Sequence, residues 1–436
     1  SIQTESGNLS SYHLLDEESS TSFSLIVSTV CDHCKDVLSR IQVLNRFPIN
    51  VAKYKEWLED YNSEIYLFTN ERFSDQFVGF DIKKSYKKFQ DNGLVDYDAI
   101  ELYEQNPYDA IIALDETEIV RAARLRERFN LRGQNMKSAL AFRDKVIMKD
   151  YVSSAGLKTP AYKKIESSVD LYDFEKTHGY PFIIKPVDGM ASKSVSVIKN
   201  HQELKLYLEK GIPKDMMVET FIKGTMHNVD GIISDGKIAF ISVGQYLDDA
   251  LSFKKGSSYT LLPPNHSLFK RIKYFTEEII KSLPTPNFTP FHCEIFHTEN
   301  DELVFCEIAS RVGGGRLDAA INEAYGIDLY RIWVRNECSL PIEIPSTVEL
   351  KSLVGGVFIP SKNGKLLSRP SKIPFDWVVL YDPFGNEGET FNNPNSVIDS
   401  IAIVLVRGNT LKEVEQRIFI IRDWFEENVV WGLMEK

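Results

Sequence analysis

Two glutamates lie where a metal ion would offset their charge. Segments 291–296 (FHCEIF) and 302–308 (ELVFCEI) alternate in a strand-like pattern and predict a β-hairpin. With a two-residue loop at 300–301, Glu294 faces Glu307 directly across the hairpin, where like charges are destabilising. Oxygen ligands that need neutralisation indicate Mg²⁺ or Mn²⁺ carried with a phosphate substrate. In another register both would be ordinary surface glutamates.

A glycine-rich turn follows the second glutamate. The glycines at 313–315 precede a helix expected from about Leu317. Consecutive glycines before a helix N-terminus let backbone N–H groups approach an anion closely. Arg311 and Arg316 flank the glycines and add forked donors suited to phosphate or carboxylate. We expect this turn to bind an anion, although a plain flexible turn has the same composition.

Two lysines complement these groups. Lys185 lies in the apolar strand 181–187 (PFIIKPV), where a lysine is costly unless it snorkels or meets an anion. Lys145 lies in a helix, and its position alone would make it a surface residue. The small polar turn 188–194, which includes Ser192, offers backbone and hydroxyl donors that could close over phosphates, or it is a plain hairpin loop.

The elements that would position these residues change in type along the chain. Apolar runs predict strands, and apolar residues three and four apart predict helices. Strands are predicted at 23–30, 65–69, 110–114, 181–187, 194–198, 216–221, 229–233, 237–243, 291–296, 303–308, 353–359, 377–381 and 401–407. Helices are predicted at 37–47, 117–129, 143–156, 202–210, 268–282, from about 317 to Asn336, and 411–427.

These patterns predict an α/β and α+β multidomain protein. The expected parts are a flexible tail at 1–22, an open α/β domain at 23–140, a central domain at 141–338 and a C-terminal α+β domain at 339–436. Residues 181–243 are expected to form one antiparallel unit, with a lid at about 180–240. No GxGxxG follows the first strand, so a dinucleotide site is not expected there.

Composition excludes several functional classes. The 51 Lys and Arg residues against 62 Asp and Glu residues give a formal charge of −11, which disfavours nucleic-acid and anionic-membrane partners. No apolar stretch approaches the roughly 18 to 20 residues of a membrane span. Five cysteines are an odd count in a large chain, which favours a reducing, cytoplasmic location. Cys31 and Cys34 form a CxxC without a second pair, so zinc is not expected.

Four segments taken in order resemble the ATP-grasp superfamily, in particular its L-amino acid ligase-like carboxylate–amine ligases. They are FRDKVIMKDYVSSAGLKTP, YPFIIKPVDGMASKSVSVI, MMVETFIKGTMHNVDGII and FHCEIF with VFCEIASRVGGG, and they cover about residues 140–335. Residues 23–135 resemble the family's pre-ATP-grasp domain, and the C-terminal part resembles the small last domain of those ligases. The resemblance implies an ATP-grasp fold with a lid subdomain.

The resemblance also implies roles for single residues. Lys145 and Lys185 would contact ATP phosphates, Glu219 and the backbone of Phe221 and Ile222 would hold adenine and ribose, and His227 would lie near the ribose. Glu294 and Glu307 would bind Mg²⁺, and Arg311 would contact the transferred phosphate. Two positions depart from the family. Ala309 replaces a common Asn, which removes a third metal ligand, and Ser257 stands where similar ligases often carry His.

The activity implied is ATP-dependent amide formation from an amino acid carboxylate and the amine of an amino acid or small amine. An acylphosphate would form, ADP and phosphate would leave, and Arg316 or the glycine-turn amides would stabilise the oxyanion. Two alternatives stay open: transfer to the thiol of a carrier protein, and a catalytically silent nucleotide-binding protein. The second is suggested by Ala309 and by Met190 and Ala191 in the lid loop, which is usually richer in glycine in this family. A homodimer is also open.

Overall fold

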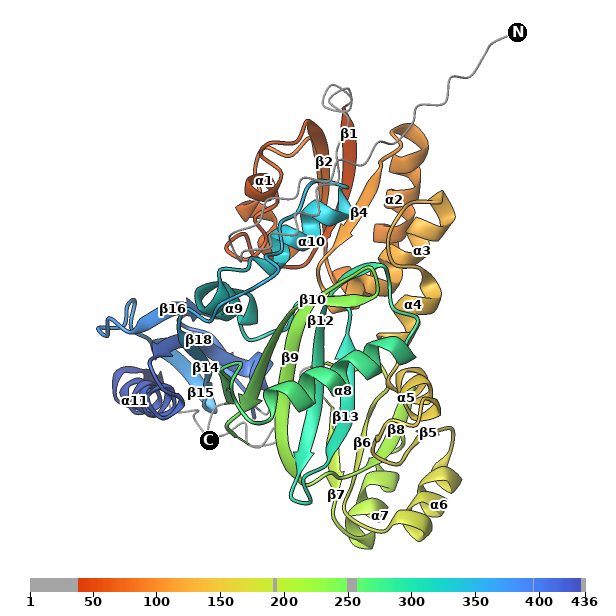
Figure 1. Cartoon of the computed structure of the whole chain (residues 1–436), viewed down its shortest axis with the longest axis vertical. Helices are drawn as coiled ribbons and strands as arrows, with labels where there is room; N and C mark the ends of the chain where they lie inside the picture. The colour runs from red at the N-terminus through yellow and green to blue at the C-terminus, as the bar shows by residue number, and fades with distance from the viewer. Residues whose placement is uncertain (1–37, 191–193, 249–256, 395, 433–436) are drawn as a thin grey trace, which may run out of the picture.

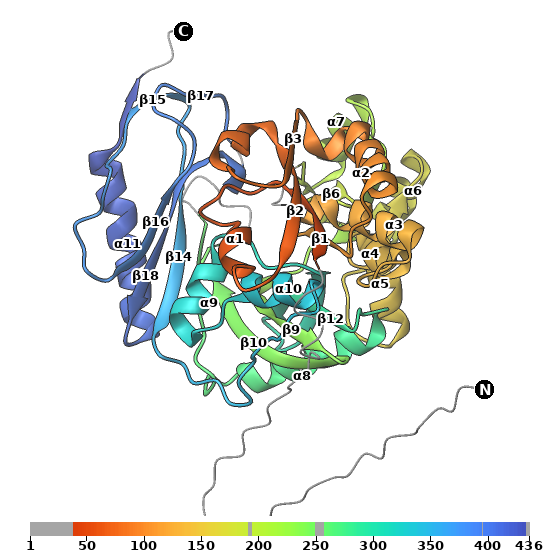
Figure 2. The same cartoon turned by 90° about the horizontal axis from the view of Figure 1, so that it is seen from above.

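The computed structural model describes residues 38–190, 194–248, 257–394 and 396–432. Within these ranges the N-terminal domain and a small four-stranded unit lie at opposite ends of the molecule, with a large sheet between them (Figure 1). The C-terminal strands and their long helix pack along one side, as the view from above shows (Figure 2). No helix in the described ranges combines the length and the apolar character that crossing a bilayer requires.

The N-terminal domain is a parallel sheet in the order β3-β2-β1-β4. Its elements are β1 (Ser39–Asn45), α1 (Tyr54–Trp57), β2 (Ser63–Asn70), η2 (Glu71–Gln76), β3 (Ile82–Tyr86), η3 (Phe89–Asp91), α2 (Gly93–Gln105), β4 (Ala110–Ala113), η4 (Glu116–Glu118) and α3 (Ile119–Phe129). Apolar residues of α2 and α3 cover one face of the sheet. The other face packs on α1 and on α10 (Leu329–Glu337), a helix that comes from much later in the chain.

The helix predicted at 37–47 is wrong, because β1 occupies Ser39–Asn45. The strand is buried on both faces, but two polar residues, Gln42 and Asn45, interrupt its apolar run. The remaining apolar residues then have a spacing that resembles that of a helix. Gln42 Nε2 donates to the carbonyl of Tyr66, and Asn45 Nδ2 donates to Thr69 Oγ1. These bonds satisfy the NH₂ groups of both buried amides, whereas Gln42 Oε1 has no hydrogen-bond partner among the described residues. The strand predicted at 23–30 and the tail at 1–22 lie outside the described residues.

Helices α4 (Met136–Ala141) and α5 (Lys145–Ser154) lead into the four-stranded antiparallel unit, whose order is β5-β8-β6-β7. Its elements are β5 (Tyr162–Ile165), α6 (Ser168–His178), β6 (Phe182–Pro186), β7 (Ser196–Ile198), α7 (His201–Glu209) and β8 (Met216–Thr220). Helices α6 and α7 pack on this four-stranded sheet and form a small apolar core with it.

The large sheet is antiparallel and has the order β13-β12-β9-β10-β11-β14-β18-β16. Its strands are β9 (Gly224–Ser234), β10 (Lys237–Tyr246), β11 (Ser258–Leu261), β12 (Phe288–Thr298), β13 (Leu303–Ala309), β14 (Leu353–Pro360), β16 (Val378–Pro383) and β18 (Ser400–Gly408). The strands predicted at 229–233 and 237–243 are present, but β9 and β10 belong to this sheet and not to one unit with β6 and β8. Pairing of β9 along the whole of β12 accounts for this placement.

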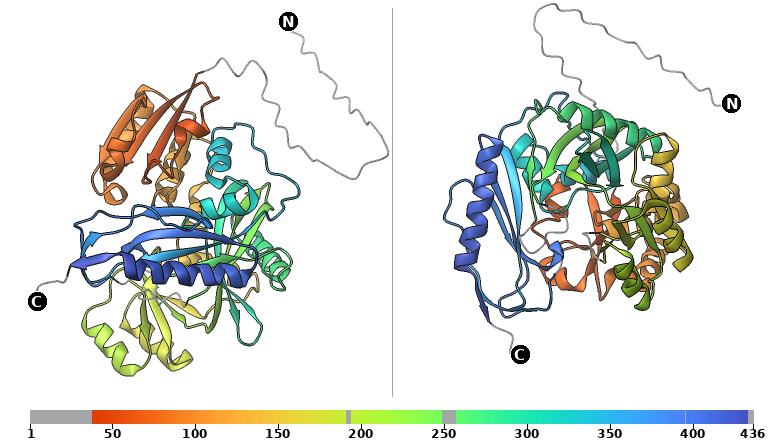
Figure 3. Two further views of the ribbon diagram at one scale, coloured as in Figure 1. Left: turned by 90° about the vertical axis from the view of Figure 1, so that its left-hand side faces the viewer. Right: turned by 90° about the horizontal axis from the view of Figure 1, so that it is seen from below.

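Helices α5 and α8 (Phe269–Ser282) bury their apolar sides on β9, β12 and β13. At the other end of the sheet, α11 (Leu411–Asn428) packs on β14 and β18. A further sheet in the order β17-β15-β19 consists of β15 (Gly364–Ser368), β17 (Thr390–Phe391) and β19 (Val430–Gly432), and η6 (Val397–Asp399) precedes β18. The side view shows the C-terminal strands and α11 between the N-terminal domain and the four-stranded unit (Figure 3).

The single helix expected up to Asn336 is two helices, α9 (Leu317–Tyr325) and α10. Gly326 ends α9 with φ of +73°, a conformation that glycine adopts without steric penalty. Asp328 then caps α10 by accepting a hydrogen bond from the backbone N–H of Arg331. The break turns α10 toward the N-terminal sheet, which it covers.

Candidate active site

The predicted opposition of Glu294 and Glu307 is confirmed, although the predicted loop is not. The backbone N–H of Thr298 donates to the carbonyl of Glu302, so the turn holds three residues and the pairing beside it is shifted by one. A β-bulge then leaves Cys306 without a paired residue and restores the register in which Glu294 faces Glu307.

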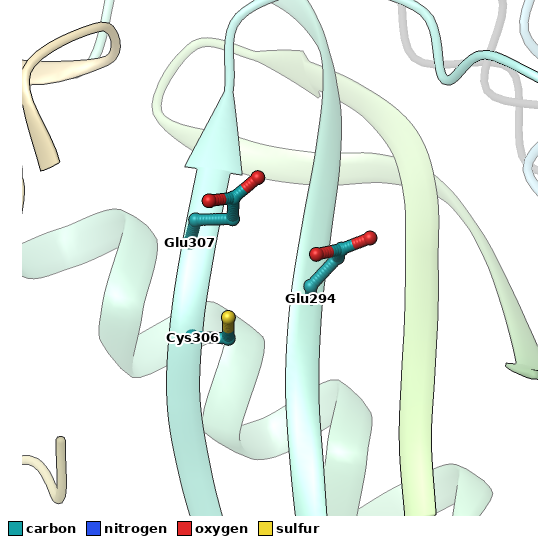
Figure 4. Close-up of side chains that lie close together, drawn as sticks. All are labelled: Glu294, Cys306 and Glu307. Atoms are coloured by element: carbon teal, nitrogen blue, oxygen red, sulfur yellow. The ribbon is translucent and has the colours of Figure 1, made fainter. Parts of the chain in front are cut away.

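The bulge gathers three side chains at the end of the hairpin. The carboxylate oxygens of Glu294 and Glu307 and the Cys306 sulfur lie within 4.8 Å of one another (Figure 4). Burial raises the pKa of the Cys306 thiol to about 12, so the thiol stays protonated and is a poor ligand. The two carboxylates are 21% and 30% exposed and supply the oxygen donors that Mg²⁺ or Mn²⁺ prefers. The donor set therefore fits the expected metal, held by Glu294 and Glu307.

Lys145 is brought to this pair by the first turn of α5. Its Nζ lies 3.4 Å from Glu307 Oε2 and donates to the carbonyl of Gly189 at 2.6 Å. The Asp144 side chain caps the helix, and the backbone N–H of Lys145 donates to the carbonyl of Val187. Burial opposes ionisation of Glu307, but nearby lysines, led by Lys145, outweigh it and lower its pKa to about 2.

Lys185 lies on β6 and forms a buried ion pair with Glu219 of β8, Nζ to Oε1 at 2.5 Å. Lys149, fully buried on α5, lies 3.4 Å from the other oxygen, Oε2. Burial disfavours the charged forms of Glu219 and Lys185. The two lysines nevertheless lower the pKa of Glu219, and Glu219 raises that of Lys185. Glu219 Oε2 is buried and has no hydrogen-bond partner among the described residues, which leaves an acceptor free for a ligand.

Glu294 has different neighbours. Tyr246 of β10 donates its hydroxyl hydrogen to Glu294 Oε1 at 3.1 Å, and His292 Nε2 lies 3.7 Å from the same oxygen. His292 Nδ1 contacts Asp230 Oδ1 at 2.8 Å. Burial opposes protonation of His292, but Asp230 outweighs it and raises the pKa to about 9. A protonated imidazole therefore faces one carboxylate, while lysines face the other.

The glycine turn lies over this network. A side chain at Gly313 would place its Cβ 2.4 Å from Asp230 Oδ1 and 2.7 Å from His292 Nδ1, so only glycine lets the backbone approach so closely. Arg316 begins α9 with φ of +56°. Its guanidinium contacts Asp318 at 3.1 Å and, on the C-terminal part, Asp382 at 2.6 Å.

Arg311, at the start of the turn, is tied to the N-terminal domain. Its Nε and Nη2 donate to Glu116 Oε2 at 2.9 and 2.5 Å, and Nη1 donates to the carbonyl of Val312. Burial lowers the pKa of Arg311, but Glu116 outweighs it and raises the pKa above the usual range. Arg143 donates to the second oxygen of Glu116 at 2.8 Å.

The structure does not bring every candidate to this place. His227 pairs with Ile295, the neighbour of Glu294, so its side chain lies on the opposite face of the sheet, where Nδ1 donates to the carbonyl of Gly244. That position does not favour the expected ribose contact. Phe221 and Ile222 lie in the connection between β8 and β9. Ser192 and the segment 249–256, which precedes Ser257, lie outside the described residues.

Sequence reasoning missed Lys149, Glu116 and Arg143. Lys149 follows Lys145 by four residues in one helix, and this spacing alone would have placed both lysines on one side. Arg143 lies two residues before Lys145, at the first position of the predicted helix, where helical periodicity does not show which way a side chain points. No local pattern marks Glu116, because its partners Arg143 and Arg311 are distant in the chain.

Parts of this chain are similar in sequence to known proteins. The family model of the ATP-grasp domain matches residues 142–315. The L-arginine-specific L-amino acid ligase of Bacillus subtilis is 26% identical over 282 residues, which cover 61% of this chain and 66% of the relative. The D-alanine–D-alanine ligase of Geobacter sulfurreducens is 29% identical over 134 residues, 30% of this chain and 42% of the relative. The chain thus spans just under two thirds of the first relative and less than half of the second.

Solved structures extend the similarity beyond the matched domain. The crystal structure of an L-amino acid ligase from Bacillus licheniformis superposes with a TM-score of 0.73 at 16% identity, covering 91% of this chain and 99% of that one. At this identity the likeness establishes the fold. Residues 142–315 match the ATP-grasp domain, and the chain is similar to the L-amino acid ligases.

Proposed function

We propose that this chain is an ATP-dependent ligase that joins the carboxylate of one amino acid to the amine of another amino acid or small amine. The observation that supports the proposal most directly is the convergence of an opposed carboxylate pair, Glu294 and Glu307, with Lys145 and the anion-binding turn at one end of the large sheet. Two relatives are named as ligases of amino acids. Amino acids are therefore the substrates to test first.

ATP would bind between the four-stranded unit and the large sheet. Lys145 and Lys185 would contact its phosphates, since each presents a buried ammonium group near the carboxylate pair or its neighbours. Glu219 would accept a hydrogen bond from the adenine amino group through Oε2, which accepts no hydrogen bond from the described residues, and the backbone of Phe221 and Ile222 would complete the base contacts. Ser192 is proposed as a further phosphate donor.

Glu294 and Glu307 would hold the metal. When bound there, Mg²⁺ or Mn²⁺ would neutralise the pair and polarise the phosphate oxygens. Glu294 would be oriented by Tyr246 and His292, and Glu307 by Lys145. These partners differ, so the two ligands would be positioned independently.

The chemistry begins with a carboxylate, which is a poor electrophile. Transfer of the γ-phosphoryl group to it would give an acylphosphate, and Arg311 would contact the transferred group as charge develops. The amine would then attack the carbonyl, and backbone N–H groups of the glycine turn would stabilise the oxyanion. Arg316, whose donors are held by Asp318 and Asp382, would fix the turn against the C-terminal part.

The test is ADP and phosphate release across a matrix of amino acid pairs with Mg²⁺. A ligase releases both products only with a particular pair, and the amide product appears in equal amount. Glu307→Gln should abolish release. Glu302→Gln is the matched control on the same hairpin, because Glu302 is 46% exposed and forms an ion pair with Lys158, away from the carboxylate pair.

Other outcomes would redirect the proposal. Phosphate release that needs a carrier protein and yields a thioester would replace the amine acceptor with a thiol. ATP binding without release under any pairing would favour a silent nucleotide-binding protein and overturn the ligase.

A further inference from the structure

One buried carboxylate joins the N-terminal domain to the site. Glu116 begins η4 at the carboxyl end of the parallel sheet, where two residues separate it from the end of β4, and is 7% exposed. Loops at the carboxyl ends of parallel strands commonly line ligand sites. Here the loop reaches across to residues of the ATP-grasp domain.

Both oxygens of Glu116 are engaged, each by a different arginine. Oε2 accepts from Nε and Nη2 of Arg311, and Oε1 accepts from Nη1 of Arg143 at 2.8 Å. Arg143 in turn donates from Nη2 to the carbonyl of Asp188 at 2.8 Å. Charge-assisted bonds of this kind are stronger and more directional than neutral ones.

The hydrogen bonds of Arg311 determine which of its N–H groups remain available to a ligand. Glu116 occupies the edge formed by Nε and Nη2, and the carbonyl of Val312 takes one hydrogen of Nη1. Nη1 and Nη2 carry two hydrogens each, so the end of the guanidinium retains donors that an anion can use. Without Glu116 the planar group would be free to rotate, and a misplacement of about 1 Å can reduce a rate by about 100-fold.

Glu116 also remains charged. Burial alone would raise its pKa, but Arg311, Arg143 and Lys145 outweigh burial and lower it below the usual value. A neutral amide at this position could not accept three bonds from two cations with the same strength.

We propose that Glu116 is a positioning residue for phosphoryl transfer, which aims the Arg311 guanidinium at the transferred group and holds Arg143 beside it. This inference rests on the proposed ligase function. It makes the N-terminal domain part of the phosphoryl-transfer machinery.

The test compares Glu116→Gln with Glu118→Gln. Glu118 lies in the same 3₁₀ segment, is fully buried and pairs with Arg121 inside the N-terminal domain, so it matches Glu116 except in its partners. With the amino acid pair that the wild type uses, Glu116→Gln should lower kcat roughly 10- to 100-fold, while Glu118→Gln leaves kcat within about threefold. The dissociation constant of Mg²⁺ with a non-hydrolysable ATP analogue should stay within about threefold in both.

A second comparison separates positioning from general support. Combined with Arg311→Lys, Glu116→Gln should add less than about threefold to the loss of kcat, because both changes disrupt the same ion pair between Glu116 and Arg311. Losses that multiply would overturn the inference. If Glu116→Gln does not fold, Glu116→Asp decides, since it keeps the charge but withdraws it by one methylene group. A lower kcat with unchanged analogue binding supports the role, and a wild-type kcat overturns it.

Failure of this inference is distinct from failure of the proposed function. A wild type that releases ADP while Glu116→Gln matches it in kcat refutes only the positioning role. A wild type that releases no ADP with any amino acid pair refutes the ligase, and the role of Glu116 with it.

Discussion

Glu294 and Glu307 should differ in what they contribute to stability, although both are proposed to bind the same metal. The perturbation is Glu294→Gln against Glu307→Gln in the metal-free protein. Each change keeps the size of the side chain and removes one negative charge. The difference between them then reports the charged neighbours of each carboxylate.

The magnitudes follow from the distances. At an effective dielectric constant of about 20, the pair repels by about 3.5 kcal/mol at the 4.8 Å limit of their separation. Lys145 at 3.4 Å from Glu307 attracts it by about 5 kcal/mol on the same scale, and Lys185 and Lys149 add to this. His292 at 3.7 Å from Glu294 attracts that carboxylate by about 4.5 kcal/mol, which nearly cancels the repulsion.

We therefore expect Glu307→Gln to destabilise the metal-free protein by about 2 to 3 kcal/mol and Glu294→Gln by less than about 1 kcal/mol. Thermal unfolding in the presence of a chelator measures this as a lower Tm for Glu307→Gln, by about 3 °C, and a nearly unchanged Tm for Glu294→Gln. Adding Mg²⁺ and a non-hydrolysable ATP analogue should raise the Tm of the wild type and of neither variant.

The control is Glu302→Gln, whose exposed ion pair should contribute little to Tm. A Tm for Glu294→Gln that falls as far as that of Glu307→Gln would refute the assignment of neighbours. Full stabilisation of either variant by Mg²⁺ and the analogue would refute its role as a metal ligand.

Three further predictions concern single positions. Burial lowers the pKa of His227 to about 4, so its contribution to stability is complete above the unfolded-state value near 6.5 and is lost as pH falls, by about 2 kcal/mol at pH 5. His227→Leu should flatten the change in urea midpoint between pH 7 and pH 5, and an unaltered slope would contradict this account. Lys149→Met should lower the unfolding free energy by about 1 to 3 kcal/mol, because Glu219 keeps only one of its two cations; an unchanged urea midpoint would show that this contact is not stabilising. Gly313→Ala should reduce turnover by at least about 10-fold, whereas Gly314→Ala, whose added Cβ meets nothing within 4 Å, should not; equal effects would be inconsistent with the crowding beneath Gly313.

The opposition of Glu294 and Glu307 was predicted correctly, but it depends on two features that the sequence did not reveal. Alternation in two short segments predicted that Glu294 faces Glu307, which is correct. The turn is one residue longer than expected, and the bulge at Cys306 compensates for that residue. Neither turn length nor a bulge without glycine leaves a clear pattern in composition, so the agreement depended on their cancellation.

Errors in the fold arose where polar residues are buried or where a helix breaks. Gln42 and Asn45 made a two-sided strand look amphipathic, because their hydrogen bonds cannot be read from the sequence. Gly326 and Asp328, in contrast, are a stop signal followed by a capping residue, and they could have predicted the break between α9 and α10.

The site was least predictable where domains meet. Lys145, Lys185 and Glu219 lie on elements of the ATP-grasp domain, and the family resemblance named them. Glu116 and Arg311 are 195 positions apart, and only the packing of the N-terminal sheet against the turn brings them together. Charge pairs across such distances depend on tertiary structure and have no periodic signature.

The large sheet has a consequence for any attempt to divide the chain. It continues without interruption from β11 to β14, across residues 339–352, where a domain boundary was expected. Cutting there would expose two unpaired strand edges, one on each fragment, and exposed edges promote association with other chains. The C-terminal segment is therefore expected to aggregate when expressed alone, and to regain solubility when the two fragments are produced together and complement each other.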